Sequence, residues 1–315
     1  MLANNDRVDI IEKNEGFKYE YAMMPIHVND ADGMIKTVQN RLHQCAIRKK
    51  YFSDHLKNTR RISSVIFLLS RSCGGAKRTS SPCVVMNLRS SLVSQPGDVC
   101  CPGGGLSLRR DRTIARLLTL PVFSLARWPF WPWWRKNFPY KAKQIALLYA
   151  AALREGFEEM RLNPFGLTFL GCLPPQNLVL FKRIIYPQAA WINSQKHFIP
   201  NWEVERIVYL PVAELLNPSN YARYRLKMSL GRHIHPSGRH TNEFLCYIHR
   251  HDNMSDILWG ATFRITMDFL RIIFGFQPPP AGILPVIKGS IKDTYFITRE
   301  IPNRFSFHAS QYKNI

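Results

Sequence analysis

The chain contains no run of 18 uncharged apolar residues, so we expect no membrane-spanning helix. Its seven cysteines are odd in number and include no CxxC pair, which argues against a zinc ribbon, a dithiol redox site or a disulfide framework. The first sixteen residues are polar and acidic and lack the apolar stretch of a secretory signal. These absences predict a cytoplasmic protein with free thiols.

Acidic residues are scarce. The 315-residue chain has 22 Asp and Glu against 43 Lys and Arg, a formal net charge of +21. Such a chain attracts polyanions, which include nucleic acids, phosphorylated metabolites and anionic membranes, and composition does not choose among them. The apolar content of 46% is typical of a globular protein, so the chain can bury a core that holds a rigid site.

Apolar patterns predict the secondary structure. Runs of strand length and composition lie at 63–70, 83–89, 167–173, 178–186, 205–210 and 243–249. Helical patterns lie at 34–46, 144–162 and 257–274. This order predicts an α/β protein with a mixed sheet between helices. We expect a helical leader at 1–60, a main domain at 61–276 with an insertion at about 112–145, and a tail at 277–315.

The segment Ala151–Leu162 places three of the scarce acids on one helix face. Glu155, Glu158 and Glu159 stand at positions i, i+3 and i+4. Like charges at this spacing destabilise a helix by about 0.2–0.5 kcal/mol per pair. A hard divalent cation, Mg²⁺ or Mn²⁺, would offset this repulsion, because such ions take oxygen ligands from carboxylates and phosphates. The alternative is a solvated acidic helix face.

The run from Arg154 to Glu159 reads R-E-G-F-E-E and resembles the helical half of the Nudix box, R-E-(apolar)-x-E-E-x-G-(apolar). That box opens with a glycine loop, and the sequence PGGG at 102–105 supplies one upstream. Glycines there let backbone amides approach a phosphate.

Residues outside the box extend the resemblance over about 63–274. Arg89, QPGD (95–98) and PGG (102–104) are similar to the R…G…FPGG stretch of the Nudix subfamily that hydrolyses coenzyme A. Later similar landmarks are EV (203–204), LPVAELL (210–216) and ILWGAT (257–262).

The resemblance implies an α/β/α sandwich that cleaves a diphosphate linkage with the help of Mg²⁺ or Mn²⁺. Coenzyme A or an acyl-CoA is the implied substrate, giving a phosphopantetheine fragment and adenosine 3′,5′-bisphosphate. The implied catalytic residues are Arg154, which orients the helix face, and the metal ligands Glu155, Glu158 and Glu159. The implied substrate-binding residues are Arg89, Gly103, Gly104 and Glu203. The alternatives are hydrolysis of another nucleoside diphosphate derivative, or a catalytically weak module that binds a ligand or a membrane.

The chain departs from the family pattern in three places. Arg161 replaces the glycine after the glutamate pair, and Gly156 replaces an apolar residue in the helix, where glycine costs about 1 kcal/mol. About 40 residues separate the glycine loop from the helix, far more than an ordinary loop. Asp111 is the only candidate for the acid expected shortly after the glycines. We expect these departures to affect activity more than fold.

The insertion is rich in tryptophan and proline. Four of the seven tryptophans lie at 128, 131, 133 and 134, and prolines at 121, 129, 132 and 139 exclude one regular helix. Tryptophan mixed with Lys and Arg at 125–141 suits a peripheral membrane contact. The rings suit equally a lid over the core or a homodimer contact. Base stacking ranks lowest, because no nucleic-acid motif accompanies the segment, and we expect no specific nucleic-acid partner.

Histidines at 233, 235 and 240 form a further candidate, with His-x-His spacing that can bind a metal. No acid or cysteine at matching spacing completes the set. We interpret this segment as a loop near phosphate rather than as a metal site.

Overall fold

The computed structural model describes residues 31–49, 51–52, 61–71, 82–178, 183–228, 241–251, 254–291 and 295. The histidine loop at 233–240 lies outside these ranges, as do parts of the expected leader and tail. Every cysteine within them is a free thiol. No helix in the described ranges is long and apolar enough to cross a bilayer.

The larger sheet has eight strands. They are β1 (Ile62–Ser70), β2 (Cys83–Arg89), β3 (Val99–Cys100), β4 (Gly103–Gly105), β5 (Leu167–Cys172), β6 (Gln176–Leu178), β7 (Arg183–Ile192) and β8 (Val204–Pro211). The main order is β3-β2-β1-β7-β5, with β4 on β1, β6 on β7 and β8 on β2. The pair β1–β7 is parallel and its neighbours are antiparallel, so the expected mixed sheet is confirmed.

A second sheet has the order β11-β10-β9-β12. Its strands are β9 (Tyr221–Met228), β10 (Thr241–His251), β11 (Met254–Leu258) and β12 (Val286–Ile291). β12 pairs in parallel with β9, so part of the expected tail belongs to this sheet. The sequence predicted one sheet, and the helix expected over 257–274 begins only at Gly260, because Ile257 and Leu258 pair with β10.

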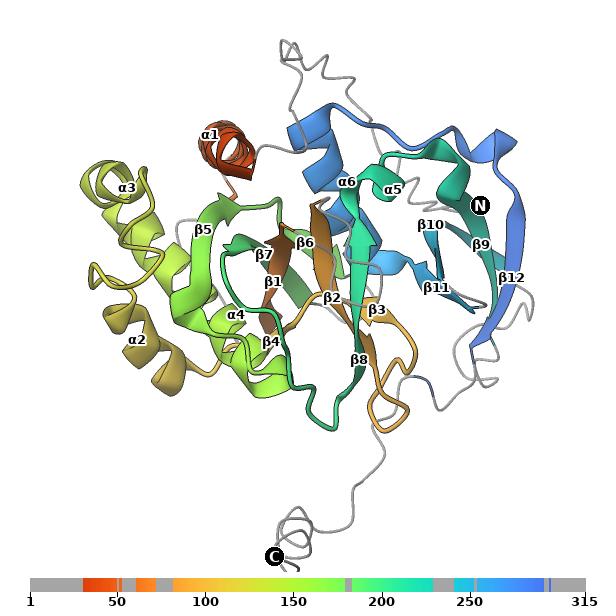
Figure 1. Ribbon diagram of the computed structural model, residues 1–315, viewed down its shortest axis with the longest axis horizontal. Coiled ribbons are helices and arrows are strands. Elements are labelled where there is room, and N and C mark those ends of the chain that lie inside the picture. Colours follow the sequence, from red (N-terminus) through yellow and green to blue (C-terminus); the bar gives the residue numbers. More distant parts are fainter. Residues whose placement is uncertain are drawn as a thin grey trace, which may run out of the picture.

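Helices cover both faces of the larger sheet. They are α1 (Ala31–Arg48), α2 (Leu108–Leu117), α3 (Trp131–Asn137), α4 (Pro139–Met160), the short α5 (Val212–Leu215) and α6 (Gly260–Phe274). Figure 1 shows the larger sheet in the middle, with α2, α3 and α4 to the left and the second sheet to the right. The α/β/α arrangement expected from the sequence is therefore confirmed.

Prolines shape the insertion without preventing helices. Pro132 and Pro139 each stand in the first turn of a helix, α3 and α4 respectively, where a missing N–H costs nothing. The prolines do exclude one continuous helix, as expected. The helix expected over 144–162 instead begins at Pro139 and ends at Met160, since proline suits a helix start.

Three of the four tryptophans in the insertion are buried by the chain itself. Trp128, Trp131 and Trp134 are 2–4% exposed, whereas Trp133 is 37% exposed. The Trp134 Nε1 donates a 3.2 Å hydrogen bond to Nδ1 of His43 on α1. The His43 ring also stacks on the insertion, 3.8 Å from the ring of Phe130. The buried rings therefore join the insertion to α1.

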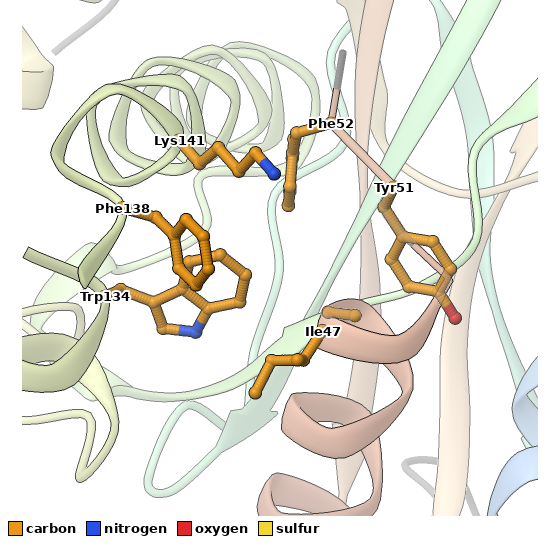
Figure 2. Close-up of a pocket in the computed structure, with 7 residues that line it drawn as sticks. Ile47, Tyr51, Phe52, Trp134, Phe138 and Lys141 are labelled. Carbon is orange, nitrogen blue, oxygen red and sulfur yellow. The ribbon is translucent and has the colours of Figure 1, made fainter. Parts of the chain in front are cut away.

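The end of α1 and the insertion line a small pocket (Figure 2). Its volume is about 20 Å³, room for roughly one water molecule. The lining residues are Ala46, Ile47, Tyr51, Phe52, Trp134, Phe138 and Lys141. It contains none of the glutamates of the candidate site and is too small for a diphosphate.

Helix α1 also packs on the larger sheet and shares its core. Met34, Val38 and Leu42 are fully buried. The Gln39 Nε2 donates a 2.8 Å hydrogen bond to the backbone oxygen of Phe169 on β5. The helix of the expected leader is therefore part of the same hydrophobic core as the sheet.

Burial keeps His43 neutral, which predicts a pH effect on stability. Desolvation lowers the pKa of His43 from 6.5 to about 4. Because the folded pKa lies below the unfolded one, the stability linked to neutral His43 is present above pH 6.5 and is lost as the pH falls towards 4. His43 is partly exposed, so we expect a loss of the order of 1 kcal/mol, or about 2–4 °C in Tm.

The variant His43→Phe keeps an aromatic ring and cannot titrate. It lacks the acceptor for Trp134, so its Tm should be lower than that of the wild type at neutral pH. Thermal denaturation between pH 7 and pH 4 should then show a smaller drop in Tm for His43→Phe. Equal drops in both proteins would show that His43 does not sense this pH range.

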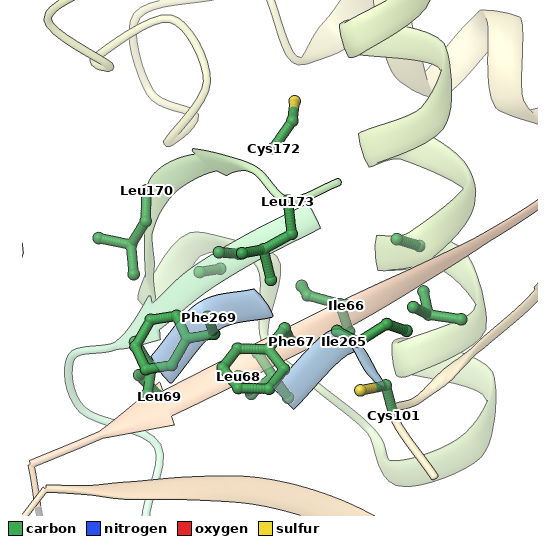
Figure 3. Packing of buried hydrophobic residues seen from close by; sticks show 14 of the residues in the cluster. Ile66, Phe67, Leu68, Leu69, Cys101, Leu170, Cys172, Leu173, Ile265 and Phe269 are labelled. Atoms are coloured by element: carbon green, nitrogen blue, oxygen red, sulfur yellow. The ribbon is translucent and has the colours of Figure 1, made fainter. Parts of the chain in front are cut away.

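The core of the larger sheet lies between α4 and α6 (Figure 3). Phe67 on β1 packs against Phe269 on α6, with ring centroids 4.9 Å apart. The adjacent Ile66 contacts the opposite layer, because a Cβ built on Gly156 of α4 would lie 3.7 Å from its Cγ2. Successive strand residues point to opposite faces, so these two contacts place α4 and α6 on opposite sides of the sheet.

Candidate metal and diphosphate site

The glycine loop of the sequence forms β4, which pairs antiparallel with β1. A Cβ on Gly103 would lie 2.5 Å from the backbone oxygen of Ser64, and its φ is +153°. A Cβ on Gly104 would lie 2.6 Å from Oε1 of Glu155. Only glycines let this strand pass between β1 and the acidic face of α4.

Glu159 is the most buried of the three glutamates, with 8% of its surface exposed. Asn87 Nδ2 donates a 2.8 Å hydrogen bond to its Oε2, and the Gly103 N–H donates to its Oε1 at 3.4 Å. Burial raises the pKa of Glu159 to about 8, and repulsion from Glu155 and Glu203 adds to this effect. A buried carboxyl with acidic neighbours suits a cation partner.

Glu155 and Glu158 lie further out on the same helix face. Burial raises the pKa of Glu155, and the 2.9 Å contact with Arg154 Nη1 opposes that rise. Glu158 is half exposed and lies 3.4 Å from Nη1 of both Arg154 and Arg110. Each glutamate therefore has different partners. The exposed fraction of the side chain increases from Glu159 to Glu155 to Glu158.

Asp111 comes from α2 of the insertion and is fully buried. Its Oδ1 accepts a 2.7 Å hydrogen bond from Nε of Arg154, and its Oδ2 accepts one of 2.6 Å from the Ser107 backbone N–H. Arg154 Nη2 also donates to the Gly105 backbone oxygen at 3.0 Å. Asp111, the candidate for the acid expected shortly after the glycines, therefore does pair with Arg154, although it lies inside an unusually long connection.

Loops at two other strand ends complete the site. The Arg89 Nε donates to the Ser94 backbone oxygen at 2.8 Å, so Arg89 supports the loop that leads to the glycines. The Ser90 N–H donates to the Glu203 backbone oxygen at 2.9 Å. The charge of Glu203 raises the pKa of both Glu155 and Glu159, which places Glu203 within electrostatic range of the acidic face.

The structure thus gathers the sequence-predicted residues on one side of the fold. Glu159 accepts a hydrogen bond from Gly103, Glu155 lies against Gly104, and Arg154 contacts Glu155 and Glu158. Arg89 and Glu203 interact with Glu159 through their charges.

Asn87 is a site residue that the sequence analysis missed. It is buried on β2 and holds Glu159 through Nδ2, while its Oδ1 has no hydrogen-bond partner among the described residues. The available signal was a single amide within the otherwise apolar run CVVMNL (83–88). A buried polar group that lacks a partner is costly, so this oxygen suits a ligand or an ordered water.

Two distant landmarks of the sequence meet beside the glycine loop. Trp259 Nε1 donates a 3.0 Å hydrogen bond to Oδ1 of Asp98, and the Tyr295 hydroxyl donates to Oδ2. Burial raises the pKa of Asp98, and these two donors oppose the rise. The contact fixes the loop before β3 against the start of α6.

Among the described residues, no three His, Cys, Asp or Glu side chains converge closely enough to hold a metal ion. The glutamates instead form ion pairs or hydrogen bonds with Arg154, Arg110, Asn87 and Gly103. The donor chemistry nevertheless fits Mg²⁺ or Mn²⁺, because the groups are carboxylate oxygens with an unpartnered amide oxygen beside them. Their mutual repulsion also favours a cation.

Two departures from the Nudix pattern have a structural explanation at the end of α4. Arg161 caps the helix in the left-handed conformation, φ 55° and ψ 41°, where glycine is the usual residue. The Leu162 N–H then donates to the Gly156 oxygen at 3.2 Å. A Cβ on Gly156 would lie 2.9 Å from Cδ2 of Leu162, so the glycine allows the chain to fold back closely over the helix.

Arg161→Gly is expected to stabilise the protein by about 0.5–1 kcal/mol. The left-handed conformation costs an L-residue about 1–2 kcal/mol, and the greater freedom of glycine in the unfolded chain offsets part of the gain. Thermal denaturation would measure this as a rise in Tm. Arg161→Ala keeps the backbone strain and removes the contact with the Phe157 ring, so it should not be stabilised. A lower Tm for Arg161→Gly than for Arg161→Ala would contradict this account.

No protein-family model and no curated protein sequence matches the chain. Among solved structures, similarity is found to a Nudix hydrolase from M. smegmatis, RenU, with 15% identity over 50% of this chain and 73% of that one, and a TM-score of 0.31. An Ap4A hydrolase from C. elegans gives 12% identity over 49% and 83%, with a TM-score of 0.32. The Nudix domain of Shewanella oneidensis NrtR, solved with ADP ribose, gives 13% over 54% and 85%, with a TM-score of 0.32. These values are too low to transfer an activity to this chain.

Proposed function

We propose that the protein is a metal-dependent Nudix-type pyrophosphohydrolase that cleaves a diphosphate linkage. The observation that carries the proposal is the placement of Glu159, a buried carboxyl with a pKa of about 8, against the glycine strand. Asn87 donates to its Oε2, and the charge of Glu155 acts on it. Carboxylates grouped on one helix face suit a metal that is shared with phosphate.

Each residue has a distinct proposed role. Glu155, Glu158 and Glu159 hold Mg²⁺ or Mn²⁺, which when bound neutralises phosphate charge and lowers the pKa of a water. Arg154, fixed by Asp111, orients the acidic face. The substrate is bound by Arg89, Gly103, Gly104 and Glu203, of which Glu203 also serves as an extra ligand or base.

We propose coenzyme A or an acyl-CoA as the substrate, cleaved to a phosphopantetheine fragment and adenosine 3′,5′-bisphosphate. The support is the sequence resemblance of Arg89, the 95–98 loop and the 257–262 stretch to the coenzyme A subfamily. The contact between Trp259 and Asp98 brings the last two of these together beside the site.

The test is a panel of diphosphates incubated with Mg²⁺ or Mn²⁺ and analysed by chromatography. The panel contains coenzyme A, an acyl-CoA, nucleoside diphosphate sugars, dinucleoside polyphosphates and nucleoside triphosphates. We expect adenosine 3′,5′-bisphosphate from the first two. Turnover of the other compounds alone would reject coenzyme A and favour the second candidate, another nucleoside diphosphate derivative. No turnover of any compound would favour a catalytically weak binding module.

The proposed partners are separate from the reaction. We propose a cytoplasmic protein that contacts a membrane peripherally through 125–141, or that forms a homodimer through the same segment. Trp128, Trp131 and Trp134 are buried by the chain itself, so these three rings are not available for a membrane contact. The exposed rings of the segment, Trp133, Phe138 and Tyr140, support the proposed contact.

A further inference from the structure

The corner between α3 and α4 combines exposed aromatic rings with basic side chains. We call this surface the α3–α4 corner and define it as Trp133, Arg135, Lys136, Phe138, Tyr140 and Lys141. Its three rings are 37–49% exposed. Phe138 ends α3 and precedes Pro139 at the start of α4, so the chain turns sharply there and leaves these rings at the turn.

The exposed rings and a basic group lie in contact with one another. The rings of Trp133 and Phe138 have centroids 5.5 Å apart. The Lys141 Nζ lies 4.9 Å above the Phe138 ring. Figure 2 shows Phe138 beside Trp134, with Lys141 reaching towards Phe52, among the residues that line the small pocket. Aromatic and basic groups in such contact are typical of a membrane–water interface.

Buried rings give this surface a rigid base. Trp134, 2% exposed, packs edge-on against both Trp133 and Phe52. It is also fixed to α1 through its hydrogen bond with His43. The exposed rings therefore need little ordering when they bind a partner.

The segment that forms the corner carries charge of one sign. The sequence from Arg112 to Arg154 contains no Asp or Glu. Arg135 and Lys136 on α3 are exposed, as is Lys143 on the first turns of α4. This local excess complements the negative surface of an anionic bilayer.

We propose that the α3–α4 corner docks on the headgroup layer of a membrane containing anionic phospholipid. The rings enter the interface and the basic side chains lie against the phosphates. The contact is peripheral, since no helix in the described ranges could span a bilayer. This proposal rests on the proposed membrane contact of residues 125–141 and not on the proposed hydrolysis. A negative result in the vesicle assay would therefore leave the turnover assay unaffected, and the reverse also holds.

The test is flotation of the full chain with vesicles of phosphatidylcholine alone or mixed with phosphatidylserine, at low and high salt. We expect the wild type to float only with phosphatidylserine and only at low salt. Arg135→Glu/Lys136→Glu should lower the bound fraction at least about tenfold. Trp133→Ala/Tyr140→Ala should also weaken binding, which a purely electrostatic attraction would not require.

The matched control is Arg183→Glu/Lys196→Glu, on β7 and the loop that follows it, where both side chains are exposed. It changes the net charge as much as the corner variant does, from +21 to +17 by subtraction of four charges. We expect it to float like the wild type. Equal loss in both variants would overturn the proposal, because it would show a general attraction of a basic chain. Circular dichroism and Tm confirm that each variant is folded.

Two other occupants of the corner are distinguished by the same variants. If a single-stranded oligonucleotide binds through Trp133 and Arg135 while vesicles do not bind, the proposal is overturned in favour of nucleic acid. If sedimentation shows a dimer that Trp133→Ala/Tyr140→Ala converts to a monomer, and vesicles do not bind, the corner is a self-association surface.

Discussion

Glu159→Gln is expected to lower turnover of the diphosphate substrate at least about 10²-fold, as loss of a metal ligand or electrostatic stabiliser does. The substitution removes the charge and keeps the size of the side chain. Asn87 and the Gly103 N–H can each still donate to the one remaining oxygen, but not both as before. The fold should therefore persist, with at most about 1 kcal/mol lost through one hydrogen bond.

Steady-state kinetics with Mg²⁺ and Mn²⁺ would measure this loss, with Glu158→Gln as the comparison. Glu158 is half exposed and pairs with two arginines, so its removal should cost less than that of Glu159. Wild-type activity that survives EDTA, or a Glu159→Gln enzyme as active as the wild type, would reject the assignment of Glu159 as a metal ligand.

The raised pKa of Glu159 adds a pH signature to the same site. With a pKa of about 8, the metal-free carboxyl is largely protonated at neutral pH, and a cation must displace that proton. The metal concentration for half-maximal activity should therefore fall as the pH rises towards 8. The stability of the metal-free protein should change in the opposite direction. Because the folded pKa of Glu159 lies above the unfolded one, the fold loses stability as the pH rises from 4.5 through 8. Glu159→Gln should remove this second effect.

The fold was predictable where side-chain patterns act locally. The apolar runs that became β1, β2, β5 and β8 alternate or are continuously buried, and each was expected from the sequence. The second sheet was not expected, because the pairing of β12 with β9 joins segments about 60 residues apart. Nothing in the local pattern of either strand specifies such a partner.

The site was predictable for residues in a contiguous motif and less so for the others. Glu155, Glu158 and Glu159 follow from helix spacing alone. Asn87 and the pairing of Asp111 with Arg154 depend on how β2 and α2 pack on α4. The burial of Trp134 depends likewise on α1, and no local pattern predicts that α1 lies beside the insertion.

Asp111→Ala is expected to destabilise the protein by about 3 kcal/mol, close to the 3–5 kcal/mol typical when one partner of a buried ion pair is removed. Asp111 is fully buried and Arg154 nearly so, with 9% of its side chain exposed. Glu155 still contacts Arg154, which reduces the loss, and the Ser107 N–H loses its acceptor, which increases it. Urea denaturation of metal-free protein would measure the difference.

Arg110→Ala serves as the control for Asp111→Ala. Arg110 comes from the same helix and pairs with Glu158, but its side chain is 69% exposed, so its removal should cost at most about 1 kcal/mol. Similar stabilities for the two variants would show that the buried pair does not fix α2 to α4. Asp111→Asn should fall between them, since its side-chain oxygen can still accept from Ser107 while the charge is lost.

The double variant Asp111→Leu/Arg154→Met separates stability from function at this pair. Replacing a buried ion pair by apolar residues of similar size is often neutral or stabilising, because both charges avoid desolvation. The double variant should therefore be more stable than Asp111→Ala. Its turnover should be lower than that of the wild type, because methionine at position 154 cannot make the contacts of Arg154 with Glu155, Glu158 and the Gly105 carbonyl. Recovery of both stability and turnover would show that Arg154 does not position the acidic face, and that the pair matters for folding alone.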